Sequence, residues 1–232
     1  MKTYGDNKLP FNLWIDNKME QFRADSFYTK EPETIDWISS FGRGDTFFDI
    51  GSNIGLYSLW CSHKHPESLT YAFEPFYGNA SRLMQNIELN KFTNIIVVPF
   101  AVGEIDRINT LGLVSRETGH SGSELSKLTD DYCLVPEITI DSFCGLFEDF
   151  PTHIKIDIDG QEFQVIAGAL KTIYDDTCQS VLVEINKDGD KIRSLFKAMG
   201  YTEDNRFNKM KNHSRVRREK ERINAENVIF TR

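Results

Sequence analysis

Apolar and polar positions alternate along the middle of the chain in a pattern that predicts strands and helices in turn. Short apolar runs rich in β-branched and aromatic residues, such as Thr46–Ile50, predict strands buried in a sheet. Longer stretches such as 77–90 carry apolar residues at helical spacing, and this alternation builds a mostly parallel sheet with helices on both faces. Strands are expected at 46–50, 69–74, 95–102, 137–140, 153–158, 180–186 and 227–231, and helices at 54–64, 77–90, from Asp141, 162–173 and 189–199.

Three segments depart from the alternation. Residues 104–135 are polar and rich in glycine, and 202–226 contain a charged run, so both are expected to be insertions on the substrate side. Residues 1–45 lack a clean period before Pro32 opens a helix, and they are interpreted as a lid or edge. The core is then 46–186, and 232 residues fit one domain.

Composition limits the class of protein. The chain has 40% hydrophobic residues, no apolar run long enough to cross a bilayer and no signal-peptide pattern at its beginning, so we expect a cytoplasmic protein without a membrane span. The four cysteines, Cys61, Cys133, Cys144 and Cys178, form no C-x-x-C pair, which favours buried free thiols over a zinc site or disulfides.

Charge is distributed unevenly. Eight basic and two acidic residues lie within 205–222, although the whole chain has a net charge of -8. Such a basic patch on an acidic body favours an anionic partner, and the simpler interpretation is a solvated surface segment.

The stretch Thr46–Gly55 joins a predicted strand to a glycine turn and a helix start, which is typical of a cofactor site. Gly51 and Gly55 bracket the turn and allow the backbone to approach a ligand. The third position of the turn is Asn53, so the G-x-G-x-x-G pattern that holds a pyrophosphate is absent. A cofactor without phosphate, such as S-adenosylmethionine, fits better. We expect Asp49 and Gly51 to contact its amino-acid end and Asn53 to cap the helix while touching the cofactor.

The second predicted strand supplies the ribose contact. It ends in Glu74-Pro75, and a carboxylate at this position can accept both hydroxyls of a ribose. Phe76 and Phe100 are candidates to stack on the adenine, although aromatic residues beside strands more often belong to the core.

Four motifs occur in an order that resembles the FkbM family of methyltransferases. They are D-I-G-S-N-I-G at 49–55, F-E-P at 73–75, A-V-G at 101–103 and I-K-I-D-I-D-G-Q-E at 154–162. The resemblance implies a Rossmann-like class I methyltransferase fold, with Ala101 and Val102 beside the cofactor together with Pro75 and Gly55. It also implies broad acceptors, covering hydroxyls on sugars, glycans and polyketide-type small molecules.

Candidate catalytic residues follow the fifth strand of the core and lie in the insertion. Asp157 is expected to act as a base or orienting group near the transferred methyl, or to join Asp159 and Glu162 in a magnesium site. For Asp159 and Glu162, a favourable charge at a helix N-terminus is the simpler interpretation. His120 lies between glycines in T-G-H-S-G and can take a hydroxyl proton, unless it is an ordinary loop histidine.

These observations predict an S-adenosylmethionine-dependent O-methyltransferase. Two rivals stay open. One is a nucleic-acid methyltransferase that uses the basic segment 205–222 to follow phosphates. The other is a protein that binds the cofactor without catalysis and serves as an interaction module. Oligomeric state cannot be inferred from these patterns.

Overall fold

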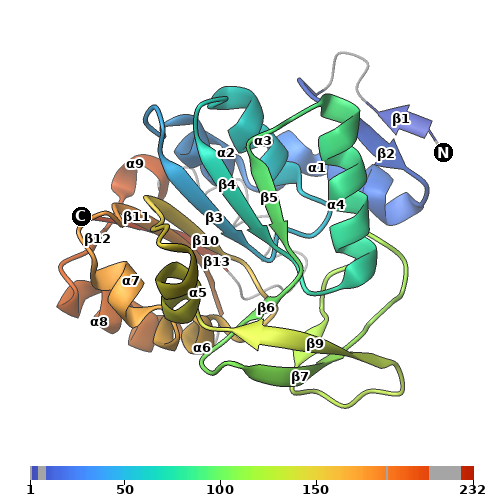
Figure 1. Cartoon of the computed structure of the whole chain (residues 1–232). Coiled ribbons are helices and arrows are strands. Elements are labelled where there is room, and N and C mark those ends of the chain that lie inside the picture. Colours follow the sequence, from blue (N-terminus) through green and yellow to red (C-terminus); the bar gives the residue numbers. More distant parts are fainter. Residues whose placement is uncertain (1, 5–8, 187, 209–225) are drawn as a thin grey trace.

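The fold centres on a seven-stranded sheet with five parallel strands. It was obtained as a computed structural model that describes residues 2–4, 9–186, 188–208 and 226–232. The strand order is β12-β13-β11-β10-β3-β4-β5, in which β13 runs antiparallel to both neighbours (Figure 1). The strands are β3 (Thr46–Ile50), β4 (Leu69–Phe73), β5 (Ile95–Val98), β10 (His153–Ile156), β11 (Ser180–Ile185), β12 (Thr202–Glu203) and β13 (Glu226–Thr231).

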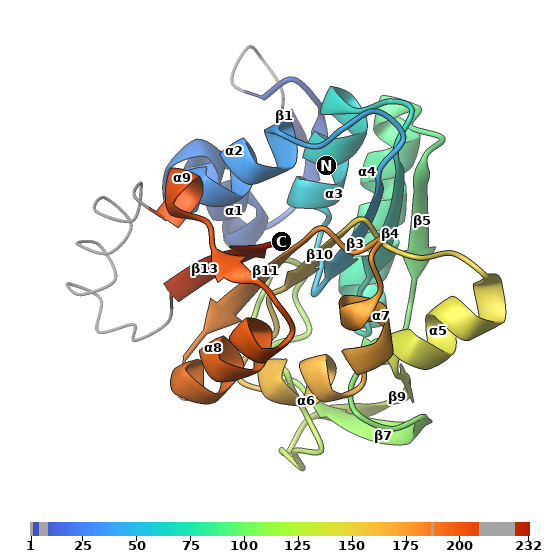
Figure 2. The ribbon, with the colours of Figure 1, turned by 90° about the vertical axis from the view of Figure 1, so that its left-hand side faces the viewer.

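Helices cover both faces of this sheet, as Figure 2 shows from the side. Alternation within β3 explains why: Phe47 packs in the apolar cluster under the first group of helices, whereas Phe48 packs in the cluster under the second group. The first group comprises α1 (Lys18–Lys30), α2 (Pro32–Ser39), α3 (Leu56–Lys64), α4 (Tyr77–Asn90) and α9 (Asn205–Asn208). The second comprises α5 (Ile140–Phe147), α6 (Glu162–Ala167), α7 (Leu170–Tyr174) and α8 (Gly189–Ala198). The predicted α/β class and mostly parallel sheet are confirmed.

The strand order reverses between β3 and β10. From β3 the chain proceeds outward through β4 to β5, and it then returns to place β10 on the other side of β3. The carboxyl ends of β3 and β10 therefore border a crevice that no crossover helix fills, which is where ligands bind in open sheets of this kind.

The segment 104–135 was predicted to be a polar insertion without strands, but it contains β-strands. A second sheet with order β6-β9-β7-β8 contains β6 (Ala101–Val102), β7 (Arg107–Gly112), β8 (Glu124–Leu125) and β9 (Tyr132–Ile138). The expected strand 137–140 belongs to β9 of this sheet, and β12 completes the seven strands of the main sheet instead. The expected strand 95–102 divides at Pro99, which has no N–H group for the ladder.

Two helix predictions also need correction. The helix expected at 162–173 is two helices, because the chain breaks at Gly168, where a Cβ atom would lie 2.1 Å from the carbonyl oxygen of Gly103. The helix expected from residue 54 begins at Leu56. Its N-cap is Gly55 and has no side-chain cap, so the prediction that Asn53 caps this helix was wrong.

The N-terminal segment packs against the core. A short antiparallel pair, β1 (Lys2–Tyr4) with β2 (Leu13–Ile15), precedes α1, whose N-cap Asn17 forms a capping box with Glu20. Pro32 opens α2 as predicted. This segment reaches the crevice, because Asn17 and Glu20 bond Thr118 of the second sheet's long loop.

Most of the basic segment 205–222 lies outside the described residues. Arg206, which is described, pairs with Asp204. All four cysteines are free thiols, of which Cys133 is half-buried and the others are buried. Within the described ranges, none of the helices has the length and apolar character needed to span a bilayer.

Candidate active site

The turn after β3 is the centre of the site. Gly51 adopts φ +80°, and a Cβ atom there would lie 2.0 Å from the carbonyl oxygen of Asp157, which follows β10. The N–H groups of Gly51 and Ser52 both donate to the carbonyl of Phe73 at 3.0 Å. Only glycine permits this approach of the β3 turn to the end of β10. The predicted approach of this backbone to a ligand stays a prediction.

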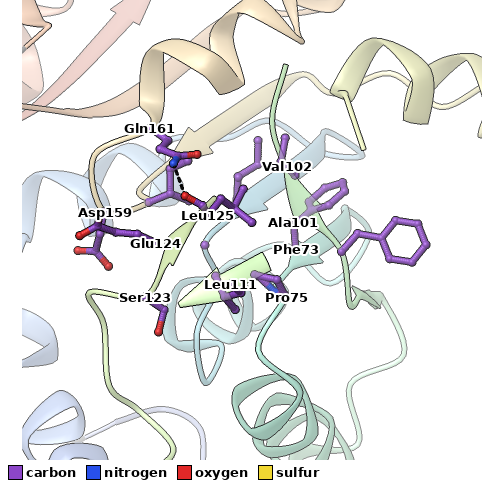
Figure 3. Close-up of a pocket in the computed structure, with 14 residues that line it drawn as sticks. Phe73, Pro75, Ala101, Val102, Leu111, Ser123, Glu124, Leu125, Asp159 and Gln161 are labelled. Atoms are coloured by element: carbon purple, nitrogen blue, oxygen red, sulfur yellow. Dashed lines mark hydrogen bonds between the residues drawn. The ribbon is translucent and has the colours of Figure 1, made fainter. Parts of the chain in front are cut away.

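An apolar cavity opens on one side of the turn (Figure 3). It contains about 410 Å³ of space, part of which is open to solvent. The main sheet and the second sheet both contribute walls. The residues lining it are Ile50, Gly51, Phe73, Pro75, Phe100, Ala101, Val102, Leu111, Ser123, Glu124, Leu125, Ile158, Asp159 and Gln161.

The structure thus brings five predicted residues to one cavity: Gly51, Pro75, Phe100, Ala101 and Val102. Phe76, the other candidate for stacking, is buried instead in the small apolar cluster beneath the second sheet. The wall formed by β7 and β8 was missed by the sequence analysis. β7 has only six residues and its partner β8 only two. Strands this short have too few alternating residues to be distinguished from a polar loop in the sequence.

Glu74 lies at the end of β4 beside this cavity and is buried. Its carboxylate accepts hydrogen bonds from the N–H of Asn53 at 2.8 Å and the N–H of Phe76 at 2.9 Å. Burial raises the pKa of Glu74 to about 7, although these two hydrogen bonds act in the opposite direction. The side chain of Asn79 contributes a further hydrogen bond that also lowers the pKa of Glu74. Glu74 does not line the cavity itself, and its contact with a ribose stays a prediction.

Asn53 joins the turn to the loop of the second sheet. Its backbone is left-handed with φ +52°, and its side-chain amide donates to the carbonyl of His120 at 2.8 Å. The next residues of the same loop are also held, because the N–H of Gly122 donates to the Asp159 carboxylate. The loop around His120 therefore lies over the glycine turn.

Asp49 does not line the cavity. Alternation along β3 directs its side chain toward α3, where its carboxylate is fully buried and accepts a hydrogen bond from Ser58 at 2.6 Å. Lys155 lies beside it in register on β10, with its Nζ atom 3.4 Å from Asp49 and 3.0 Å from Asp157. A contact of Asp49 with the cofactor stays a prediction, and so does one for Gly55, whose position is required by packing against Leu83.

Asp157 is held in its ionised form. Burial would raise the pKa of this carboxyl, but the positive charges of Lys155 and Lys30 outweigh it and lower the pKa well below its usual value. Asp157 is therefore a permanent negative charge at the crevice and a weak proton acceptor. Among the carboxylates that follow it, Glu162 accepts a bond from Gly160 and has its pKa raised to about 7 by burial.

His120 lies in the loop above the turn, with its Nε2 atom 3.5 Å from a carboxylate oxygen of Glu117 and its side chain 28% exposed. It does not line the apolar cavity, and its role as a base stays a prediction. Among the described residues, no group of three or more histidine, cysteine, aspartate or glutamate side chains is placed to hold a metal ion.

The order of strands, the glycine turn and the acidic strand end define a class I methyltransferase fold and cofactor crevice. The family model of the methyltransferase FkbM domain matches residues 49–203, which contain all four motifs. The chain belongs to this family and is an S-adenosylmethionine-dependent methyltransferase.

Two known methyltransferases are similar to this chain at low sequence identity. The chain is 24% identical over 187 residues to "Methyltransferase 1" of Beauveria bassiana, covering 71% of this chain and 75% of that protein. It is 26% identical over 147 residues to "Hexuronic acid methyltransferase AglP" of Haloferax volcanii, covering 63% of this chain and 58% of that protein, so the match spans less than two thirds of AglP.

Two solved structures resemble the fold. One is a putative rRNA methylase from Clostridium thermocellum, with a TM-score of 0.51, 10% identity and coverage of 94% of this chain and 97% of that chain. The other is a precorrin-6y C5,15-methyltransferase from Geobacter metallireducens, with a TM-score of 0.50, 12% identity and coverage of 83% and 79%. At these identities they establish the fold and not the acceptor.

Proposed function

We propose that the protein transfers a methyl group from S-adenosylmethionine to a hydroxyl on a sugar, a glycan or another small molecule. The observation that supports this proposal most is that the crevice is apolar on one side of Gly51 and polar on the other. One side is the apolar cavity, whereas Asp157 and the loop of His120 border the turn with polar groups that suit a hydroxyl acceptor. AglP is by its name a hexuronic acid methyltransferase, and a hexuronic acid is a sugar derivative.

The residues present fit the cofactor. The apolar cavity suits the adenine, the carboxylate of Glu74 suits the ribose diol, and the close approach of the Gly51 turn to Asp157 places this aspartate beside the cavity. When bound, S-adenosylmethionine supplies a methyl group that its sulfonium charge has already activated. The chain therefore has to position the acceptor and exclude water, and positioning can contribute about 7 to 11 kcal/mol.

Asp157 and His120 have separate roles in this proposal. Asp157 stays ionised, so it attracts the positive end of the cofactor and does not take the proton. His120 takes the proton from the acceptor hydroxyl, since a neutral imidazole nitrogen can accept one. Its backbone carbonyl, rather than its ring, anchors the loop through Asn53, so the ring can be changed without releasing the loop.

An acceptor screen tests the proposed reaction. We expect methyl transfer from labelled S-adenosylmethionine to at least one member of a panel of neutral sugars, uronic acids and small-molecule hydroxyl compounds. Product analysis should locate the methyl group on oxygen. Transfer only to single-stranded or duplex nucleic acid, with activity that falls steeply as salt rises, would replace this proposal by the nucleic-acid alternative.

Replacing His120 tests the base. We expect His120→Gln to lower kcat about a hundredfold, the lower range for a general base, with little change in the Kd of S-adenosylhomocysteine. Steady-state kinetics and calorimetry measure the two quantities. His63→Gln is the matched control, because that ring lies in the last turn of α3. An unchanged kcat in His120→Gln removes the residue from the mechanism.

A further inference from the structure

One face of α1 packs against the loop that precedes His120, and Arg23 lies on it. Glu20, one turn earlier, is buried and bonds both Arg82 and Thr118, which fixes this face of the helix against the second sheet's loop. The Nε atom of Arg23 donates to the carbonyl of Gly119 in the same loop. The guanidinium group is thereby held near the turn without using its two terminal nitrogens.

Arg23 has no counter-ion in the part of the chain that the structure describes, since none of its nitrogens lies within ion-pair distance of a carboxylate there. Lys30, two turns further along α1, differs in this respect. Its Nζ atom pairs with Glu31 at 2.7 Å, and Glu31 also accepts a hydrogen bond from Tyr57. Of these two cations near the crevice, Arg23 is the one left to neutralise a ligand.

The position of Arg23 relative to the site follows from the loop to which it is bonded. The next residue after Gly119 is His120, whose carbonyl accepts the bond from Asn53 of the glycine turn. Burial raises the pKa values of Glu74 and Asp159, and the charge of Arg23 partly opposes this rise; it also adds to the lowering of the pKa of Asp157. Arg23 is therefore within electrostatic reach of the ends of β4 and β10.

S-adenosylmethionine ends in an amino acid, which carries an ammonium and a carboxylate group. Asp157 supplies a negative charge at the end of β10 for the ammonium. A matching positive charge is needed for the carboxylate, and a buried or half-buried ion without a partner is costly. We propose that Arg23 of the N-terminal helix binds the carboxylate of the cofactor's methionine part, so that Asp157 and Arg23 together hold the zwitterionic tail.

This role makes the N-terminal segment a part of the cofactor site, although it precedes the region matched by the family model. A guanidinium group can form two parallel hydrogen bonds to a carboxylate, which lysine cannot. The same contact would fasten α1 and the loop around His120 more tightly when cofactor is bound. The inference rests on the cofactor site of the proposed function and is independent of the acceptor.

Two ligands separate the tail from the rest of the cofactor. S-adenosylhomocysteine has the amino-acid tail, and 5′-methylthioadenosine has the same adenine and ribose without it. We expect Arg23→Gln to weaken S-adenosylhomocysteine about 10- to 100-fold, as for a lost charge-assisted hydrogen bond, and to leave 5′-methylthioadenosine within about twofold. Arg23→Lys should lie between Arg23→Gln and the wild type. Isothermal titration calorimetry on the full chain measures each Kd.

Lys18→Gln is the matched control, since it removes the same charge from an exposed position on the same helix. It should leave both ligands unchanged. Unaltered binding of 5′-methylthioadenosine also shows that Arg23→Gln is folded. Equal weakening of both ligands, or an unchanged Kd for S-adenosylhomocysteine with a raised KM for the acceptor, would overturn the assignment. If the wild-type chain binds S-adenosylhomocysteine but methylates no hydroxyl, the proposed acceptor fails and this inference is unaffected.

Discussion

Gly51→Ala is expected to abolish cofactor binding and to destabilise the fold. A Cβ atom at this position would lie 2.0 Å from the Asp157 carbonyl oxygen and 3.1 Å from a side-chain carbon of Ile158. The backbone conformation, with φ +80°, adds about 1 kcal/mol for a residue other than glycine. Because the neighbouring atom is backbone, the ends of β3 and β10 must separate at the edge of the cavity, where we propose that the cofactor binds.

The displacement acts on chemistry as well as on binding. A shift of about 1 Å in a reacting group can lower the rate about a hundredfold, and the steric block to the cofactor adds to this loss. Because the misplaced reacting groups and the weaker cofactor binding both lower the rate, we expect kcat/KM to fall by a factor of about a thousand or more. Thermal unfolding and calorimetry with S-adenosylhomocysteine measure the two consequences separately.

Gly145→Ala provides the comparison. Gly145 lies in α5 with no atom within 4 Å of an added Cβ, so this variant should bind the cofactor normally and be slightly more stable. A Gly51→Ala protein with wild-type affinity for S-adenosylhomocysteine would show that the turn is only a strand-to-helix connection.

Glu74→Gln is expected to weaken binding of 5′-methylthioadenosine by about a hundredfold and to remove its dependence on pH. The carboxylate accepts two backbone N–H groups and, in the proposed site, the ribose hydroxyls, whereas an amide must turn its NH₂ group toward one of those donors. The expected loss of affinity, about a hundredfold, corresponds to the loss of hydrogen bonds to a charged group.

The pH dependence follows from the raised pKa of Glu74. With a pKa of about 7, the carboxyl is mostly protonated at pH 6 and mostly ionised at pH 8. Ribose hydroxyls donate to the ionised form, so binding releases a proton and the affinity of the wild type should rise about tenfold from pH 6 to pH 8. 5′-Methylthioadenosine is the suitable ligand, because it lacks the amino group that titrates in the same range.

Glu88→Gln is the control, because it removes a carboxylate from an exposed position on α4. It should keep both the affinity and the pH profile. A Glu74→Gln variant that retains the slope between pH 6 and pH 8 would assign the proton to another group, of which Glu162 has a pKa in the same range.

The order of the main strands and the turn were predictable because their signals are local. A buried strand, a glycine turn and an acidic residue at the next strand end lie within 30 residues. In the structure Gly51 lines the cavity, and Glu74 bonds the N–H of Asn53 in the same turn. The resemblance to the family also predicted Ala101 and Val102 beside the cofactor. Both residues line the cavity, although they form only a two-residue strand.

What could not be predicted depends on long-range contacts. The second sheet pairs β7 with β9 across about twenty residues of loop, so its strands read locally as a polar insertion. The direction of the Asp49 side chain depends on which face of β3 meets α3, and the low pKa of Asp157 depends on Lys155 from its own strand and Lys30 from α1. The spacing of Lys155 and Asp157, two residues apart, is typical of side chains on one face of a strand. The Asp49–Ser58 contact and the effect of Lys30 on Asp157 have no sequence spacing that would identify them.

The most direct test of the central claim is calorimetric titration of the full chain with S-adenosylhomocysteine, followed by its thermal unfolding. We expect one binding site and, at a ligand concentration about 100 times the Kd, a stabilisation of about 2.7 kcal/mol. For a chain of this size that corresponds to a rise in Tm of roughly 5 to 10 °C. No heat of binding and an unchanged Tm at millimolar ligand would contradict the account.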